Sequence, residues 1–241
     1  HDSSREGSRM STIEEIAAKG EILVNLHTSF PAERIVDIDN FRSLLYYYGL
    51  LTICGTRGDR LRMCIPNHCV REQYIGFLRD YYQQIHPLNL SHLKDQIDDL
   101  VYDGHWKPFF DSIAGAYHEN SSIRDGMEGE RNLQGFLKAY LALASYYLVE
   151  PELEMNYGYC DFFLLPDKQR YPDIEHSYIL ELKYAARTAT DAELAAQAEE
   201  GRRQLHQYSE DKIARQLAKG TTLHRLLLQF RGWEMLRCEE I

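Results

Sequence analysis

The spacing of apolar residues along the second half of the chain predicts helices and strands in alternation. Apolar positions recur with helical spacing over 128–147 and over 190–219, the latter being one long helix or a helix pair. Short apolar runs of strand length lie between and after them, at 159–165, 177–184, 223–230 and 233–238. This order predicts an α/β (α+β) fold in which helices pack against one mixed sheet.

The first half predicts a smaller helical and β-hairpin region. Helices are expected at 11–19, 40–49 and 71–85, and a strand at 21–26. Ser11 is placed to cap the first helix, with Glu14 three residues later as in a capping box. Two strand-like runs flank Arg57-Gly58-Asp59, which is typical of a hairpin. Helix, hairpin and helix in this order resemble a winged-helix element, although a generic α/β layer fits the same pattern.

A polar stretch separates these two halves. One or two further helices, broken near Gly104, are expected over 90–117, and the polar residues 119–126 follow them. We therefore expect an accessory region at residues 1–120 and a second domain at residues 121–241.

Composition and charge exclude several classes of protein. The chain has 241 residues, 44% of them hydrophobic, which excludes a disordered or collagen-like protein. Its formal net charge of −10 argues against a polybasic nucleic-acid coat, but a local basic groove on an acidic body stays open. No apolar run reaches the ~20 residues of a membrane span. Five scattered cysteines indicate reduced thiols, so we expect a cytoplasmic protein without a membrane partner.

Two neighbouring apolar strands carry the charges that suggest chemistry. The run 177–184 contains one carboxylate and one ammonium, Glu181 and Lys183, which share a face because side chains alternate along a strand. Asp161 interrupts the preceding strand in the same way. Charged groups are rarely buried unless they are paired or bind a metal. If the two strands pair, Asp161 and Glu181 converge on a site suited to Mg²⁺ or Mn²⁺. A metal, two carboxylates and a lysine are the groups needed to hydrolyse a phosphodiester.

The sequence around these residues resembles a known family. Asp161 and, after nineteen intervening residues, Glu181-Leu-Lys183 resemble the core motif of the PD-(D/E)XK nuclease superfamily. The stretches 156–166 and 178–184, with Gln204-Leu-His-Gln-Tyr208, look like the C-terminal nuclease-like domain of bacterial proteins that begin with a predicted AAA-type ATPase domain. The residue before Asp161 is Cys160 instead of the proline of the superfamily's name.

This resemblance implies a fold, an activity and roles for six residues. The fold would be restriction-endonuclease-like, and the activity would be metal-dependent cleavage of nucleic acid, with DNA as the expected substrate. Asp161 and Glu181 would hold Mg²⁺ or Mn²⁺, and Lys183 would position the attacking water. Glu130 would orient a ligand or a water, and Gln204 and Tyr208 would face the site from one side of a helix. No Walker A motif occurs. With the start at a residue other than Met, this suggests a C-terminal fragment that lacks the ATPase domain.

The same residues allow other interpretations. A glutamate such as Glu130 on an amphipathic helix is usually exposed, and Gln204 and Tyr208 can serve packing alone. Basic residues around the last long helix could follow phosphates, but the interleaved acidic residues favour a salt-bridged surface. These basic residues are Arg187, Arg202, Arg203, Lys212 and Arg215.

Two functions compete with nuclease activity. The first is a non-cutting nuclease-fold module that regulates or targets an ATPase, which the net charge favours and the intact Asp, Glu and Lys set disfavours. The second is a winged-helix DNA reader in the first half. It requires basic residues on the helix after the hairpin, which carries Arg71 and Arg79.

Overall fold

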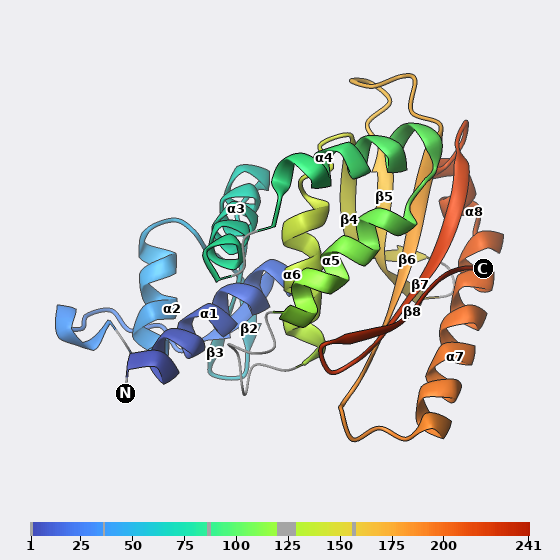
Figure 1. The fold of residues 1–241 in the computed structure, drawn as a ribbon. Coiled ribbons are helices and arrows are strands. Elements are labelled where there is room, and N and C mark those ends of the chain that lie inside the picture. The colour runs from blue at the N-terminus through green and yellow to red at the C-terminus, as the bar shows by residue number, and fades with distance from the viewer. Residues whose placement is uncertain (1, 36, 86–87, 120–128, 156–157) are drawn as a thin grey trace. The chain divides into compact units, whose positions relative to one another are not determined.

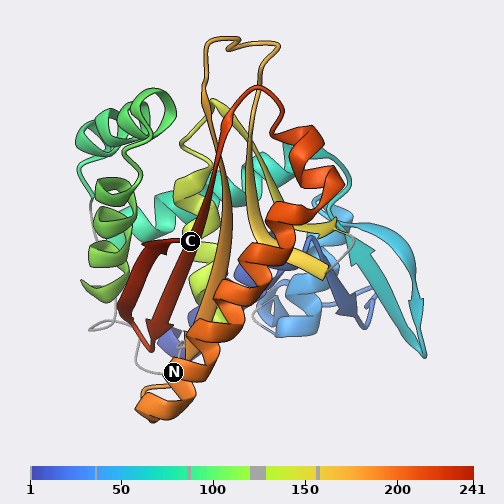
Figure 2. The same cartoon turned by 90° about the vertical axis from the view of Figure 1, so that its right-hand side faces the viewer.

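The computed structural model describes residues 2–35, 37–85, 88–119, 129–155 and 158–241. The chain divides into two compact units, one made of residues 1–85 and 131–139 and the other of residues 86–130 and 140–241. Figures 1 and 2 show the elements of both units from two directions. The boundary expected at residues 120 and 121 lies outside the described residues, so this division into domains stays a prediction.

The first unit is built on a three-stranded antiparallel sheet of order β1-β3-β2. Its elements are α1 (Asp2–Lys19), β1 (Glu21–Val24), the 3-10 helix η1 (Ala32–Arg34), α2 (Ile38–Tyr47), β2 (Thr52–Arg57), β3 (Arg60–Cys64) and α3 (His68–Ile85). The hairpin of β2 and β3 turns at Gly58, whose φ of 66° is the positive value that a two-residue hairpin loop requires. The predicted hairpin is confirmed.

Helix α1 is longer than the sequence pattern predicted. It begins at Asp2, so Ser11 lies inside it and the predicted cap at Ser11 is wrong. Glu14, expected in a capping box, is buried and accepts hydrogen bonds from the Tyr82 hydroxyl at 2.8 Å and from Asn132 Nδ2 at 2.9 Å. Asn132 lies on α6 (Glu130–Leu141), most of which packs in this unit. A buried tertiary contact has therefore overridden the local capping signal.

The second unit is a five-stranded mixed sheet of order β4-β5-β6-β7-β8, in which only β6 and β7 are parallel among the described pairs. Its helices are α4 (Leu90–Asp98), the π-helix η2 (Asp99–Asp103), α5 (Lys107–Glu119), α7 (Asp191–Glu210) and α8 (Lys212–Leu217). Its strands are β4 (Tyr147–Met155), β5 (Gly158–Pro166), β6 (His176–Ala185), β7 (Thr222–Arg231) and β8 (Glu234–Glu240). Helices α7 and α8 connect the parallel pair, as in a βαβ unit. The predicted α/β fold with a mixed sheet is confirmed.

One boundary of the predicted pattern is wrong. The helix expected over 128–147 ends at Leu141, its predicted start at Glu128 lies outside the described residues, and Tyr147 begins β4. Turn-type hydrogen bonds at Leu143 and Ala144 end the helix. An apolar run such as 147–149 fits a buried strand as well as a helix, because periodicity alone does not separate the two in a short segment.

The two faces of this sheet meet different helices. Strand β6 turns Tyr178 toward one face, where its hydroxyl donates to the carbonyl of Leu100 at 2.6 Å. It turns Ile179 toward the other face, into a buried cluster with Ala198, Leu205 and other residues. Figures 1 and 2 show α7 along this second face and α5 on the first. Glu181 and Lys183 alternate with the first-face residues and so lie under α7. None of the helices in the described ranges has the length and apolar character needed to cross a membrane.

Candidate active site

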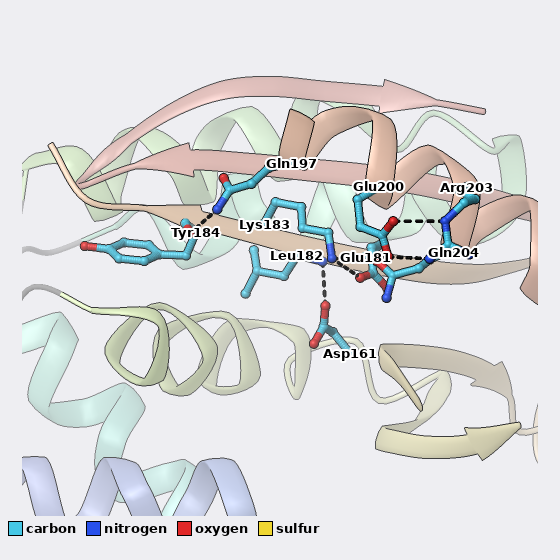
Figure 3. A network of polar contacts seen from close by, with 9 residues as sticks. All are labelled: Asp161, Glu181, Leu182, Lys183, Tyr184, Gln197, Glu200, Arg203 and Gln204. Atoms are coloured by element: carbon cyan, nitrogen blue, oxygen red, sulfur yellow. Dashed lines mark hydrogen bonds and ion pairs between the residues drawn. The ribbon is translucent and has the colours of Figure 1, made fainter. Parts of the chain in front are cut away.

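The two carboxylates of the candidate site lie where β5 and β6 stop pairing. Phe163 pairs with Ile179 and Phe162 with Leu180, and these are the last pairs toward this end of the two strands. Asp161 and Glu181 occupy the next opposed positions, so the antiparallel register directs them to the same face. Asp161 Oδ2 accepts a hydrogen bond of 2.7 Å from the backbone N–H of Leu182 (Figure 3). The Asp161 carboxylate thus accepts the hydrogen bond of a β6 N–H group beyond the last β5–β6 pair, and this bond holds the carboxylate beside Glu181.

Glu181 is a buried carboxylate with an unusual pKa. It is only 3% exposed, and burial together with the nearby charge of Asp161 raises its pKa from 4.5 to about 7, although Lys183 and Tyr208 act in the opposite direction. Glu181 Oε1 accepts a hydrogen bond of 2.8 Å from Lys183 Nζ. Its other oxygen, Oε2, is buried without a hydrogen-bond partner in the described part of the chain. A buried acceptor left in this way is costly unless a cation or donor reaches it.

Lys183 links the strand to helix α7. Its ammonium donates to Glu181 Oε1 and also to Gln204 Oε1 at 2.6 Å (Figure 3). Tyr208 lies one turn further along α7 and is buried, and burial and the Glu181 charge raise the pKa of its hydroxyl. The hydroxyl therefore keeps its proton and can donate. Gln204 and Tyr208 reach Lys183 and Glu181 from one side of α7, so the structure brings five of the six predicted site residues together.

The sixth residue, Glu130, is exposed at the first position of α6. It belongs to the second unit, as the other five do, whereas residues 131–139 of the same helix belong to the first. Its proposed role at the site stays a prediction.

Sequence analysis missed Gly201, which sets the distance between α7 and the sheet. A Cβ atom at Gly201 would lie 2.6 Å from Leu227 Cδ1 and 3.4 Å from two side-chain carbons of Lys183. The absence of a side chain therefore lets α7 approach β6 and β7 beside Lys183. The signal was a glycine inside a helical pattern, three residues before Gln204, where close packing is a common reason for glycine.

The basic residues of α7 and α8 form the salt-bridged surface that their acidic neighbours favoured. Arg202 contacts Glu239 at 2.6 Å, Arg203 contacts Glu200 at 2.5 Å, and Arg215 contacts Glu210 at 2.6 Å. These guanidinium groups are neutralised locally. They do not form a free cationic path beside the site.

The site offers two carboxylates to a divalent cation. Among the described residues, no group of three or more His, Cys, Asp or Glu side chains is arranged to hold a metal ion. Mg²⁺, however, is usually bound through one or two carboxylates, with waters and phosphate oxygens as its other ligands. Asp161 and Glu181, with the unpartnered Glu181 Oε2, fit that requirement.

A mixed sheet with helices on both faces, with Asp161 on one strand and Glu181 and Lys183 on the next, defines a restriction-endonuclease-like fold. Residues 128–240 match the family model of the PD-(D/E)XK nuclease superfamily. No curated protein and no solved structure gave a match. The predicted family and fold are confirmed. Members of this superfamily hydrolyse phosphodiester bonds of nucleic acids and generally depend on a divalent metal.

Proposed function

We propose that this protein is a metal-dependent nuclease that hydrolyses phosphodiester bonds, with DNA as its substrate. The observation that supports this most is the opposed position of Asp161 and Glu181 where β5 and β6 separate, with Glu181 Oε2 buried and unpartnered in the described part of the chain. The superfamily of residues 128–240 supports phosphodiester hydrolysis.

Each residue of the site has a proposed role. Asp161 and Glu181 would hold Mg²⁺ or Mn²⁺, which when bound would polarise the scissile phosphate and stabilise the charge that develops on it. The backbone N–H of Leu182 fixes the Asp161 carboxylate in place. Lys183 would hold the attacking water, since an ammonium offers three donors and two of them already fix its position on Glu181 and Gln204.

The residues on α7 would act by positioning. Gln204 holds Lys183 from the side opposite to the strand, and Tyr208 keeps a protonated hydroxyl near Glu181. Glu130 would orient a ligand or a water, as its place in the family motif suggests. The predicted link to an AAA-type ATPase domain in the same polypeptide remains part of this proposal and rests on the sequence resemblance of 156–166, 178–184 and 204–208.

A second candidate function is a nuclease-fold module that regulates or targets an ATPase and does not cut. The net charge of −10 favours it, because the phosphate backbone is also negative. The Lys183 ammonium offsets the Glu181 charge without any added cation, which is compatible with a site that has lost its metal.

Plasmid nicking separates the two functions. Purified wild-type protein should nick supercoiled DNA with Mg²⁺ or Mn²⁺ and not in EDTA. Asp161→Asn and Lys183→Met should each lower the rate at least about 100-fold, because each removes a charge that acts on the transition state. Glu175→Gln is the matched control, since Glu175 is an exposed carboxylate next to β6. Nicking that persists in Asp161→Asn would contradict the proposed site, and no nicking by the wild type with either ion would favour the non-cutting module.

A further inference from the structure

The first unit has the element order of a winged-helix domain. A helix and a strand are followed by a helical turn, a second helix and a hairpin, and the sheet order is β1-β3-β2. In this order the hairpin of β2 and β3 takes the place of the wing. Figure 2 shows it projecting beyond the helices of its unit, and every residue of β2 except Gly55 is exposed.

The tip of this hairpin holds two opposed positive charges. Arg57 and Arg60 are direct cross-strand partners on either side of the turn, and both are exposed. Like charges in this position destabilise a hairpin. Neither guanidinium has an ion pair or a side-chain hydrogen bond to a described residue. Arg62 follows on the same hairpin but pairs with Glu21 at 3.7 Å. The hairpin itself carries three arginines and a single carboxylate, that of Asp59.

This arrangement contrasts with three arginines of the second unit. Arg202, Arg203 and Arg215 are each neutralised by a glutamate within the second unit. An unneutralised arginine pair is kept at the tip of an exposed ribbon in a protein whose net charge is −10. A row of phosphate groups would offset the repulsion between the two guanidinium groups. Arginine can donate several hydrogen bonds to phosphate at once.

Helix α2, which stands in the place of the base-reading helix, is occupied by contacts within its own unit. The Asn40 side chain bonds His27 Nδ1 at 2.6 Å and the carbonyl of Arg34 at 2.8 Å. Ser43 Oγ accepts from the backbone N–H of His27, and Arg42 contacts Glu15 and Asp39. These polar groups are not presented for base edges. Binding through this unit should therefore follow the phosphates and ignore the sequence.

We propose that the β2–β3 hairpin is a wing that binds the backbone of duplex DNA through Arg57 and Arg60, without sequence preference. The choice of DNA rests on the proposed function, whereas the phosphate contact rests on the hairpin itself. A two-stranded ribbon has dimensions that a duplex groove accepts, which favours duplex over single-stranded DNA.

Fluorescence anisotropy with a short labelled duplex in EDTA tests binding without cleavage. The double variant Arg57→Ala/Arg60→Ala should weaken binding at least about tenfold and reduce the slope of log K against log salt by about 1.8, since each phosphate contact contributes about 0.9. The control Arg203→Ala/Arg215→Ala removes the same charge from neutralised positions and should change affinity less than about twofold. A permuted duplex sequence should bind like the original.

Three results would overturn the inference. They are an unchanged affinity and salt slope in the wing variant, equal weakening in the control variant, and equal binding of a single strand of the same length. The outcome is independent of cleavage. If the wild type never nicks DNA but binds a duplex through Arg57 and Arg60, the proposed DNA binding by the hairpin is supported and the nuclease proposal fails. If the wild type nicks DNA and the variant Arg57→Ala/Arg60→Ala binds normally, only the proposal of DNA binding by the hairpin fails.

Discussion

The raised pKa of Glu181 predicts a stability that falls with pH in the metal-free protein. Burial and the Asp161 charge hold the pKa at about 7 in the folded chain, against 4.5 for an ordinary glutamate. The folded state therefore binds the proton more tightly than the unfolded state does. The favourable contribution of this proton is fully present below about pH 4.5 and is lost as the pH rises to about 7.

The size of the effect follows from the two pKa values. At about 1.4 kcal/mol for each pKa unit, the change from 4.5 to about 7 corresponds to about 3 kcal/mol over the whole range. Between about pH 6 and about pH 8 the folded protein should lose about 1.4 kcal/mol from this group. Glu181→Gln does not titrate and can still accept the hydrogen bond of Lys183, so its stability should lack this component.

Urea unfolding in EDTA, followed by tryptophan fluorescence, measures the difference. Both tryptophans, Trp106 and Trp233, lie in the second unit, so the signal reports on the unit that contains the site. The wild type and the exposed control Glu175→Gln should lose stability from about pH 6 to about pH 8 by about 1.4 kcal/mol more than Glu181→Gln does. Added Mg²⁺ should remove this difference, because a bound cation favours the ionised carboxylate.

The same pH slope in the wild type and in Glu181→Gln would refute this reasoning. It would mean that water reaches the carboxylate and that Glu181 titrates as an exposed group. A steeper loss in Glu181→Gln would also refute it, since the charge would then stabilise the fold.

Three further predictions concern neighbouring residues. Asp161→Ala should destabilise the second unit by about 1–3 kcal/mol in urea unfolding, because the N–H of Leu182 loses its acceptor, whereas Asp161→Asn should keep most of that stability and still lose nicking. Gly201→Leu should abolish nicking and lower stability by more than about 2 kcal/mol, since even a Cβ would lie 2.6 Å from Leu227 Cδ1; normal activity would show that α7 can move away freely. Tyr208→Phe should keep the fold and raise the pH at which nicking becomes maximal, because Glu181 loses a donor that lowers its pKa; an unchanged pH profile would argue that the hydroxyl does not act on Glu181.

Sequence reasoning predicted that Asp161, Glu181 and Lys183 lie close together, because the signal for this was local. The apolar strand interrupted by Glu181 and Lys183 indicated a buried site only together with the preceding strand that carries Asp161. Strand β6 runs from His176 to Ala185, one residue beyond the predicted strand at each end. That Asp161 lies beside Glu181 could be predicted from the pairing of two strands that are consecutive in the sequence. Gln204 lies where the helical spacing of the predicted motif placed it.

The features that the sequence did not reveal depend on distant surfaces. Residues 131–139 of α6 pack with the first unit, where the Lys138 ammonium donates to the carbonyl of Ala17 at 2.8 Å. The periodicity of a helix shows that one face is buried, but it does not show which other element packs against that face. Gly201 was missed for the same reason, because its role depends on Leu227 of a strand that follows later in the chain. Helix α1 begins nine residues before Ser11, at Asp2, and Glu14 is buried where a capping residue would be exposed.

Calorimetric titration of Mn²⁺ into the metal-free protein tests the central claim most directly. The wild type and Glu175→Gln should bind roughly one ion per chain, and Asp161→Asn and Glu181→Gln should each bind at least about tenfold more weakly, since each loses a charged ligand. Proton release near pH 7 should accompany binding in the wild type and in Glu175→Gln but not in Glu181→Gln, because Glu181 must ionise to hold the ion. Absence of binding by the wild type, or equal binding by Asp161→Asn, would contradict a metal nuclease built on Asp161 and Glu181.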